Sequence, residues 1–431
     1  MPSEPLQIPL PHQTRAFLWL ALSLFVAATT WLYVHRILNP WRNYLDLEKD
    51  KVIAQMGDLY SPWVGAREVL LHRRNPYGPE VTREIQVKFY GHQIHQNYVE
   101  EIQPINEQRF AYPVYTVFLL APTVYADFEI VQRWASFALA SFVIFTVLFS
   151  LNILRWRPPW KILTAIILFT LSSPQIVHGL RHQQLAVVVG FLLTAGAWCV
   201  TRNHLATAGV LLALSTIKPQ MALLPLCWFL IWALGSQSRW RLPAAFLATL
   251  SALIGAGELI LPGWLAYFLA GIAAYRKYAP TSSLLRVALG DTLGEILGAL
   301  LIAGLLVFAG RNRKAAGDSA SFTVMLASFF MTAVLVFPLF TPYNQVILIL
   351  PALLALRGWK SLPRFSRLVF FVITGWPWIV SLALLLRPPN LNSPNQTPLL
   401  PSFLVSFVPL LLPLLLMTKR TETSPPADFV P

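Results

Sequence analysis

The chain has 431 residues; 56% are hydrophobic, only 12% are charged, and the mean hydropathy is +0.57. These values exclude an ordinary soluble domain and favour an all-α polytopic protein that crosses a membrane several times. The formal net charge of +14 does not indicate a nucleic-acid partner, because the bases stand in short clusters between apolar segments. The two cysteines both lie in apolar segments, so neither a disulfide framework nor a metal site is expected.

We expect about twelve transmembrane helices, because about 20 apolar residues cross a bilayer and shorter apolar stretches can contribute. The apolar segments lie at 17–38, 130–151, 160–178, 184–201, 204–217, 220–235, 242–262, 284–309, 320–338, 342–357, 366–386 and 400–417. Together they make 1–417 a single transmembrane domain, and the polar tail 418–431 is expected to be disordered. The first segment is too long for a secretory signal, so we expect it to remain as an anchor.

Short basic clusters alternate with the apolar segments and predict the topology. The clusters are Arg155/Arg157/Lys161, Arg202, Arg239/Arg241, Arg311/Arg313/Lys314, Arg357/Lys360/Arg364 and Lys419/Arg420. Cytoplasmic loops are enriched in Lys and Arg, so we expect all of these clusters in the cytoplasm. The extracytoplasmic side then receives a large loop at 39–111 and the segments 178–184, 218–220, 263–283, 338–343 and 387–399.

Two segments beside these loops need a separate interpretation. The segment 112–125 is apolar but short, with Pro113 and Pro122 near its ends. We expect it to be a partial or re-entrant segment, or a short span. In 263–283, aromatic residues interleave with two bases, which is typical of a helix lying in the membrane interface.

The loop after the first span contains the sequence MGDLYSPWVGAREVLLHRRNPYG at 56–78. A serine and a proline can begin a helix there, so we expect a short amphipathic helix at about 62–72. Asp58 stands just before this helix, where a loop can hold a carboxylate with one face open to act as a general base. The alternative is a solvated aspartate, or one that pairs with Arg67 or Arg73.

The sequence HGLRHQQ at 178–184 is a second polar stretch at an expected outer membrane end. Arg181 and His182 can hold a phosphate or pyrophosphate, and Gln183 and Gln184 can bind sugar hydroxyls. The alternative is that these side chains only extend from the bilayer to the interface.

Lys218 interrupts a long apolar stretch, and Pro219 beside it is expected to break the helix. An ammonium below the membrane surface is costly, and it is usually paired or functional. An anionic headgroup is its natural partner. The alternative is a lysine that only reaches the interface with its side chain.

The sequence FPLFTPYNQVILILP at 337–351 has a similar break between two apolar segments. Tyr343, Asn344 and Gln345 offer a hydroxyl and two amides, which are good sugar-binding groups. A simple turn between two spans explains the prolines equally well.

Three acids also lie in apolar runs: Glu258, Asp291 and Glu295. Glu258 is a candidate second functional acid. Pairing with Arg286 or with another base explains these acids as well.

Several of these segments resemble glycosyltransferase family 87, the polyprenol-phosphate-mannose-dependent mannosyltransferases. The similar stretches are GDLYSPWVGAREVLLHRRNPYG, AYPVYTVFLLAP, SPQIVHGLRHQQ, GVLLALSTIKPQMALLPL and TPYNQVILILPALL, in matching order across 50–355. The resemblance implies a membrane glycosyltransferase of the GT-C type. Such an enzyme takes its sugar from a polyprenyl-phosphate donor, with inversion and without a metal or other cofactor.

The resemblance also implies roles for individual residues. Asp58 matches the general base that the family has in its first outer loop, and Lys218 matches the family's basic position. Arg181 and Arg276 are expected to help Lys218 bind the donor phosphate. The sugar and the acceptor are expected to contact Tyr60, Asn75, Tyr77, His182, Gln183, Gln220, Tyr343, Asn344 and Gln345. The chain departs from the family pattern at His182-Gln183, where Gly-Gln is frequent, and at Asn344-Gln345, where His is frequent.

The implied reaction moves mannose or another hexose to a hydroxyl of a lipid-linked or glycan acceptor, on the outer face of a bacterial cytoplasmic membrane. One alternative is a lipid or solute transporter or flippase, which would show paired helix breaks in repeated halves. The sequence has no clear internal repeat. A second alternative is an O-antigen-ligase-like enzyme with a lipid-pyrophosphate donor. Its large outer loop generally lies late in the chain, whereas here that loop follows the first span.

Overall fold

The computed structural model describes residues 12–40, 57–90, 108–275, 282–338 and 341–387, and all regular elements in these ranges are helices. The expected outer loop at 39–111 is therefore described only in part. The expected span at 400–417 and the tail at 418–431 lie outside the described residues.

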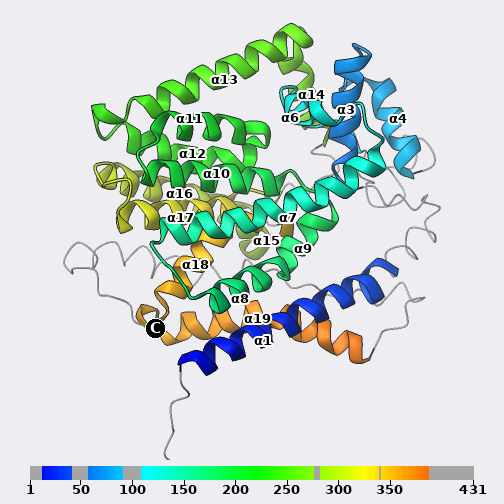
Figure 1. Cartoon of the computed structure of the whole chain (residues 1–431). Coiled ribbons are helices and arrows are strands. Elements are labelled where there is room, and N and C mark those ends of the chain that lie inside the picture. Colours follow the sequence, from blue (N-terminus) through cyan, green and yellow to red (C-terminus); the bar gives the residue numbers. More distant parts are fainter. Residues whose placement is uncertain (1–11, 41–56, 91–107, 276–281, 339–340, 388–431) are drawn as a thin grey trace, which may run out of the picture.

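Apolar helices form the centre of the molecule and run roughly side by side (Figure 1). They are α7 (Phe128–Ile153), α10 (Ala186–Thr201), α12 (Pro219–Ala233), α17 (Ala320–Val336) and α18 (Ile349–Arg357). In α17 every residue from Ser321 to Leu335 is buried, as expected for a helix that is apolar on all sides. Between α12 and α17, the Trp228 ring lies 5.6 Å from Phe322 and 6.0 Å from Phe329. Such aromatic packing holds the centre together.

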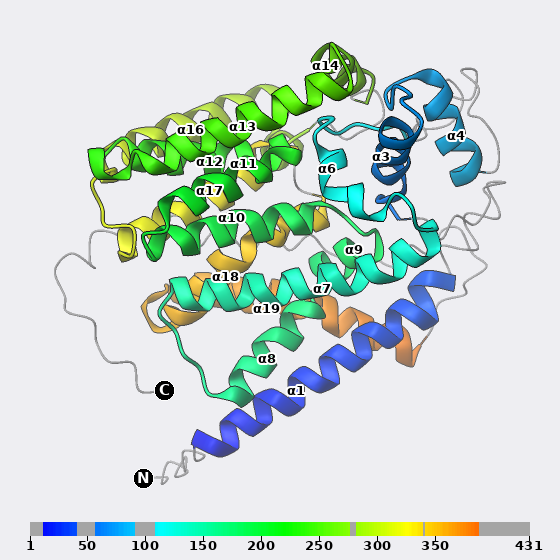
Figure 2. The same ribbon diagram turned by 45° about the horizontal axis from the view of Figure 1, so that its top comes forward.

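A second group of helices lies along one side of this core (Figure 2). It comprises α11 (Leu205–Leu214), η3 (Ser215–Ile217), η4 (Gln237–Arg239), α13 (Arg241–Ile260), α14 (Trp264–Tyr275) and α16 (Asp291–Asn312). The short helix α15 (Leu284–Leu289), which precedes α16, packs against α16 and α17. On α13 and α16 many apolar side chains point outward: Leu247, Leu259 and Leu300 are 59%, 85% and 62% exposed. Contiguous exposed apolar surface on α13 and α16 is what a lipid-facing helix requires.

A third group lies across the opposite side of the core, at the bottom of Figure 1. It comprises α1 (His12–Tyr33), the π-helix η1 (Val34–Leu38), α8 (Trp160–Leu171), η6 (Trp359–Ser361) and α19 (Arg364–Leu386). Helix α1 packs against both α8 and α19. The span expected at 160–178 is not one straight helix, because α8 and α9 (Pro174–Arg181) meet at 60°. Pro174, in the first turn of α9, cannot continue the hydrogen bonding of α8.

The other expected segments, apart from 400–417, also coincide with helices in the described ranges. The segment 284–309 is divided into α15 and α16 by Gly290, whose φ of 82° is left-handed. By length and composition, five helices can cross a membrane, or six if α8 and α9 form one bent span. The remaining apolar helices have 10–17 residues. The total of about twelve spans therefore stays a prediction.

Short helices gather at one end of the bundle: α3 (Tyr60–Leu71), α4 (Pro79–Tyr90), α6 (Thr116–Leu120) and η2 (Ala121–Thr123). Helix α3 confirms the short helix expected at 62–72. The segment 112–125 forms only α6 and η2, which are too short to cross a bilayer. Helix α14 lies where an interfacial helix was expected in 263–283.

Four of the expected cytoplasmic basic clusters lie at the opposite end of the central helices from α3 and α4. Arg155, after α7, pairs with Asp318, just before α17. Arg202, after α10, donates to Asn152 Oδ1 of α7 at 2.7 Å. Arg239, after α12, donates to the carbonyl oxygens of Arg313 and Ala315 at 2.8 and 2.9 Å. Clusters that the sequence places on one side of the membrane thus lie together in the fold.

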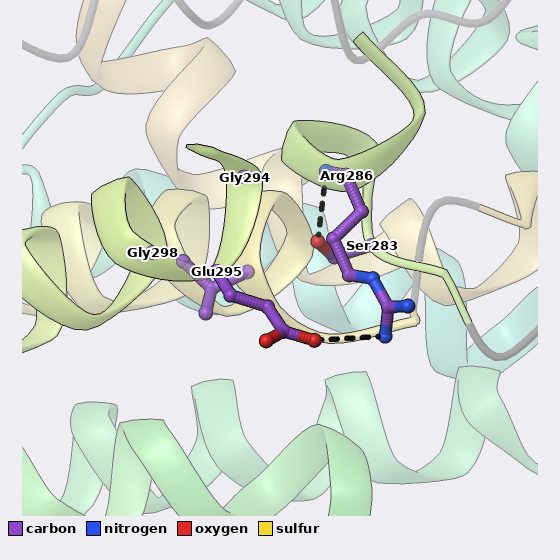
Figure 3. Close-up of a pocket in the computed structure, with 6 residues that line it drawn as sticks. Ser283, Arg286, Gly294, Glu295 and Gly298 are labelled. Atoms are coloured by element: carbon purple, nitrogen blue, oxygen red, sulfur yellow. Dashed lines mark hydrogen bonds and ion pairs between the residues drawn. The ribbon is translucent and has the colours of Figure 1, made fainter. Parts of the chain in front are cut away.

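The acids in apolar runs have structural partners. Arg286 pairs with Asp291 at 2.8 Å and with Glu295 at 3.2 Å, so the pairing interpretation is confirmed for both acids. Figure 3 shows the Arg286–Glu295 pair beside a pocket of about 230 Å³ between α15, α16 and the end of α17. Glu258 Oε1 accepts the Gly263 N–H at 2.7 Å and so closes the turn after α13.

We predict that substitutions of two glycines, one in α11 facing α13 and one in α13 itself, have opposite effects on stability. A Cβ at Gly209 of α11 would lie 2.4 Å from the Leu242 carbonyl oxygen of α13, so Gly209→Ala must separate these helices. We expect it to cost about 1–3 kcal/mol. A Cβ at Gly255 meets nothing within 4 Å, so Gly255→Ala should stabilise α13 by about 0.5–1 kcal/mol.

Thermal unfolding of the purified protein in detergent measures both effects. Gly209→Ala should lower Tm, and Gly255→Ala should leave it equal or higher. A Tm for Gly209→Ala at or above that of the wild type would contradict the close approach of α11 and α13.

Candidate active site

The loop that carries Asp58 is docked against the turn that follows α9. The Asp58 N–H donates to the His182 carbonyl oxygen at 2.7 Å. Gly57 allows this contact, because a Cβ there would lie 2.8 Å from the same oxygen and 2.9 Å from Gln183 Oε1. Gln183 itself has a left-handed φ of 51°, which turns the chain sharply from α9 towards α10. A loop before α3 and a turn before α10 thus form one unit.

The side chains of Asp58 and Lys218 are joined through a single amide. Gln184 Nε2 donates to Asp58 Oδ2, and Lys218 Nζ donates to Gln184 Oε1 at 3.1 Å. Lys218 Nζ also donates to Asn344 Oδ1 at 3.1 Å. Gln184, Lys218 and Asn344 are buried, at 4%, 7% and 4% exposure. The carboxylate and the ammonium attract each other electrostatically across this bridge.

A break between two helices places Lys218 in this position. Its φ of −128° and ψ of 76° are not helical, and Pro219 begins α12 directly after it. Proline is favoured in the first turn because its missing N–H has no partner there in any case. Tyr115 fixes the preceding turn, since its hydroxyl donates to the Thr216 carbonyl oxygen at 3.1 Å. The helix break predicted at Lys218-Pro219 is confirmed.

The break at 337–351 supplies the next wall of the site. There the 3-10 helix η5 (Pro342–Leu348) packs against α9 and α10. The Tyr343 ring lies 4.8 Å from Lys218 Nζ, a distance that allows a cation–π interaction. On the α9 side, Tyr343 stacks on His178 at 5.5 Å, and His178 lies 4.4 Å from the His182 ring. Tyr343, Asn344 and His182, predicted from two sequence motifs, therefore lie close together: Tyr343 and Asn344 contact the Lys218 ammonium, and His182 lies beside His178, which stacks on Tyr343.

The other predicted residues of these motifs lie in surroundings that differ from one residue to the next. Gln183 Nε2 donates to the Gln132 carbonyl oxygen of α7 at 3.0 Å, which holds the turn against that helix. Arg181 Nε donates to Asn39 Oδ1 at 3.0 Å, beyond η1, so this guanidinium is tied to the end of α1. Gln345 is 2% exposed, next to Asn344 in η5. Gln220 is exposed in the first turn of α12.

Tyr60, Asn75 and Tyr77 hold α3 and the following turn in place. The Tyr60 ring packs edge-on against Phe128 of α7 at 4.9 Å. Asn75 Oδ1 accepts the Tyr77 N–H at 3.0 Å, and the Tyr77 hydroxyl donates to the Tyr112 carbonyl oxygen at 2.6 Å. Burial raises the pKa of Tyr60 to about 12 and also raises the pKa of Tyr77, so both hydroxyls are protonated at neutral pH. Arg276, predicted as a phosphate ligand, lies outside the described residues.

Two of the bases that follow Asp58 in sequence, Arg67 and Arg74, contact side chains of α3 and α4. Arg74 pairs with the buried Glu68 at 2.9 Å and with Glu84 at 2.6 Å. It also lies 3.6 Å from Glu80. The Arg67 guanidinium lies 5.4 Å from the Trp63 ring. Arg74 is therefore paired with acids of α3 and α4.

Sequence reasoning missed the central part of this arrangement. Gln184 was expected to bind sugar, whereas its amide joins Asp58 to Lys218. No spacing signal identifies such a bridge, because its members come from three distant segments. Within the described residues, no cluster of three or more His, Cys, Asp or Glu side chains is arranged to hold a metal ion.

Comparison with known proteins identifies the chain at the level of its family. The family model of glycosyltransferase family 87 matches residues 110–338. The matched region contains Gln184 and Lys218, begins after Asp58 and ends before Tyr343. No curated protein and no solved structure matches the chain. Because the matched region covers more than half of the sequence, the chain belongs to glycosyltransferase family 87.

Proposed function

We propose that the protein transfers a hexose, such as mannose, from a polyprenyl-phosphate donor to a hydroxyl of a lipid-linked or glycan acceptor. Asp58 is the general base, and Lys218 binds the donor phosphate. The reaction needs no metal, and the helices form a GT-C type fold. Family membership supports the glycosyl transfer itself. The single observation that carries the assignment of the site is the bridge from the Asp58 carboxylate through Gln184 to the buried Lys218 ammonium.

The two charged groups fit the two ends of a displacement at the anomeric carbon. The Asp58 carboxylate accepts the proton of the acceptor hydroxyl while that oxygen bonds to the anomeric carbon. The bond from the anomeric carbon to the phosphate oxygen breaks, and its electron pair leaves with the polyprenyl phosphate. Lys218 stabilises the negative charge that develops on this leaving group. Attack opposite to the phosphate inverts the anomeric configuration.

Lys218 retains a hydrogen-bond donor for this task. An ammonium has three N–H donors. Among the described residues, Gln184 and Asn344 accept two of them, which leaves one for a phosphate oxygen. His182, Gln183, Tyr343 and Gln345 lie in the motifs around this ammonium and are the candidates for sugar contact. Arg181 donates to Asn39 through Nε, and its terminal guanidinium N–H groups are its candidate donors to the phosphate.

The position of the site within the bundle supports an outward orientation. Asp58 and Lys218 lie where α10 and α12 begin, whereas Arg202 and Arg239 follow the other ends of these helices. The positive-inside rule assigns the basic end to the cytoplasm. We therefore place the reaction on the extracytoplasmic face of a bacterial cytoplasmic membrane, with the polyprenyl tail of the donor in the bilayer.

We predict that Asp58→Asn lowers kcat by about 10²–10⁴-fold, because the amide cannot accept the proton. The measurement uses purified protein in nanodiscs with polyprenyl-phosphate hexoses and a membrane lipid extract as acceptor, followed by mass spectrometry of the lipids. Donor binding, measured as a donor-dependent rise in Tm, should persist. Asp127→Asn is the matched control: Asp127 is exposed at the start of α7, and its loss should change turnover less than twofold. Normal turnover by Asp58→Asn would contradict the assignment.

We predict that Lys218→Met raises the KM for the donor by about 10–100-fold, because a charge-assisted hydrogen bond to the phosphate is lost. Lys161→Met makes the same substitution in α8, at the basic end of the bundle, and should leave this KM unchanged. The thermal unfolding of each variant shows whether it is folded. A folded Lys218→Met protein with the wild-type KM would rule out the phosphate role.

A further inference from the structure

Gln184 is a buried side chain whose two polar ends face opposite charges. Its Nε2 donates to the Asp58 carboxylate, and its Oε1 accepts from Lys218 Nζ at 3.1 Å. A carboxylate only accepts hydrogen bonds and an ammonium only donates them. One orientation of the amide therefore satisfies both partners, and rotating it by half a turn would break both hydrogen bonds.

The backbone of Gln184 is also held in place. Its N–H donates to the Gly179 carbonyl oxygen of α9 at 2.9 Å, and the left-handed Gln183 precedes it. Gly179 lies close to η5, because a Cβ there would be 3.6 Å from Tyr343 Cβ. The side chain of Gln184 thus starts from a fixed point between α9, α10 and η5, and it reaches Asp58 and Lys218 from there.

We infer that Gln184 is a positioning residue, which fixes the orientation of the Asp58 carboxylate and ties it to the group that binds the donor phosphate. This inference rests on the function proposed above. It assigns to Gln184 a role other than binding sugar. The amide donates to Asp58 Oδ2 and so favours the ionised carboxylate, the form that can accept a proton. It also accepts from Lys218 and so sets the position of the ammonium relative to the base.

The inference predicts a change in the pH dependence of transfer. Without the Gln184 amide, the Asp58 carboxylate is protonated more easily, so activity should disappear at a higher pH on the acid side. The elements around Asp58 carry the following charged or titratable side chains: Lys218; His178, Arg181 and His182 on or just after α9; Tyr60, Arg67 and Glu68 on α3; Glu129 and Arg133 on α7; and Tyr343 on η5. They are identical in every variant below, so a difference between two profiles reports on Gln184.

The experiment measures kcat against pH for Gln184→Leu, Gln184→Glu and the control Gln175→Leu in nanodiscs. For Gln184→Leu we expect kcat to fall about tenfold to a hundredfold and the acid limb to move up by about one pH unit. In Gln184→Glu the introduced carboxyl and Asp58 titrate as a pair that loses its second proton only at higher pH, so its acid limb should also move up. Glutamate has nearly the shape of glutamine, so this variant keeps the test valid if Gln184→Leu does not fold.

Gln175→Leu removes an equally buried glutamine from α9, whose side chain makes no hydrogen bond within the described residues. Its acid limb should coincide with that of the wild type. Folded Gln184 variants with an unmoved acid limb, beside an active wild type, would overturn the inference and leave the proposed function standing. An acid limb that moves equally in Gln175→Leu would also overturn it. A wild type that transfers no hexose from any polyprenyl phosphate would overturn both.

Discussion

The buried ammonium of Lys218 is the constraint on which the arrangement of the site depends. Removing a charge from water is expensive unless the protein supplies partners for it. Here the partners are two amide oxygens, from Gln184 and Asn344, the face of the Tyr343 ring, and the nearby Asp58 carboxylate. These partners come from three separate segments of the chain. The need to satisfy one charge therefore holds the α9–α10 turn, η5 and the start of α12 together.

Helix breaks make this possible inside an apolar bundle. Pro174, Pro219 and Pro342 each stand in the first turn of a helix that follows a break. At such breaks the chain leaves helical geometry, and polar side chains can point inward from irregular backbone that the surrounding protein covers. Helices α10 and α12 begin at the site and are followed at their other ends by Arg202 and Arg239, so the polar site and these basic loops are separated by the length of the helices.

Much of the fold followed from the sequence. Long apolar stretches predicted the positions of most helices, because burial and lipid exposure both require such stretches. The lengths of the individual helices were harder to predict, because Pro174 bends one expected span and Gly290 divides another. The break at Lys218-Pro219 and the helix after Asp58 were both predictable, because proline chemistry acts locally.

The contacts within the site were less predictable. Tyr60 and Tyr77 look like polar ligands in sequence, yet one packs against Phe128 and the other donates to a backbone carbonyl oxygen. The direction of Gln184 depends on the left-handed turn at Gln183 and on the docking of Gly57, which only the folded chain brings together. The pairing of Gln184 with Asp58 joins residues 126 positions apart, and no periodicity in one sequence records it.

The most direct measurement is an experimental structure of the protein in nanodiscs with a bound, non-hydrolysable polyprenyl-phosphate hexose. We expect a phosphate oxygen within hydrogen-bonding distance of Lys218 Nζ and the sugar between Lys218 and Asp58. The Asp58 carboxylate should face the side of the anomeric carbon opposite to the phosphate. A donor phosphate bound elsewhere, for example at Arg286, with Lys218 still enclosed by protein alone, would contradict the account.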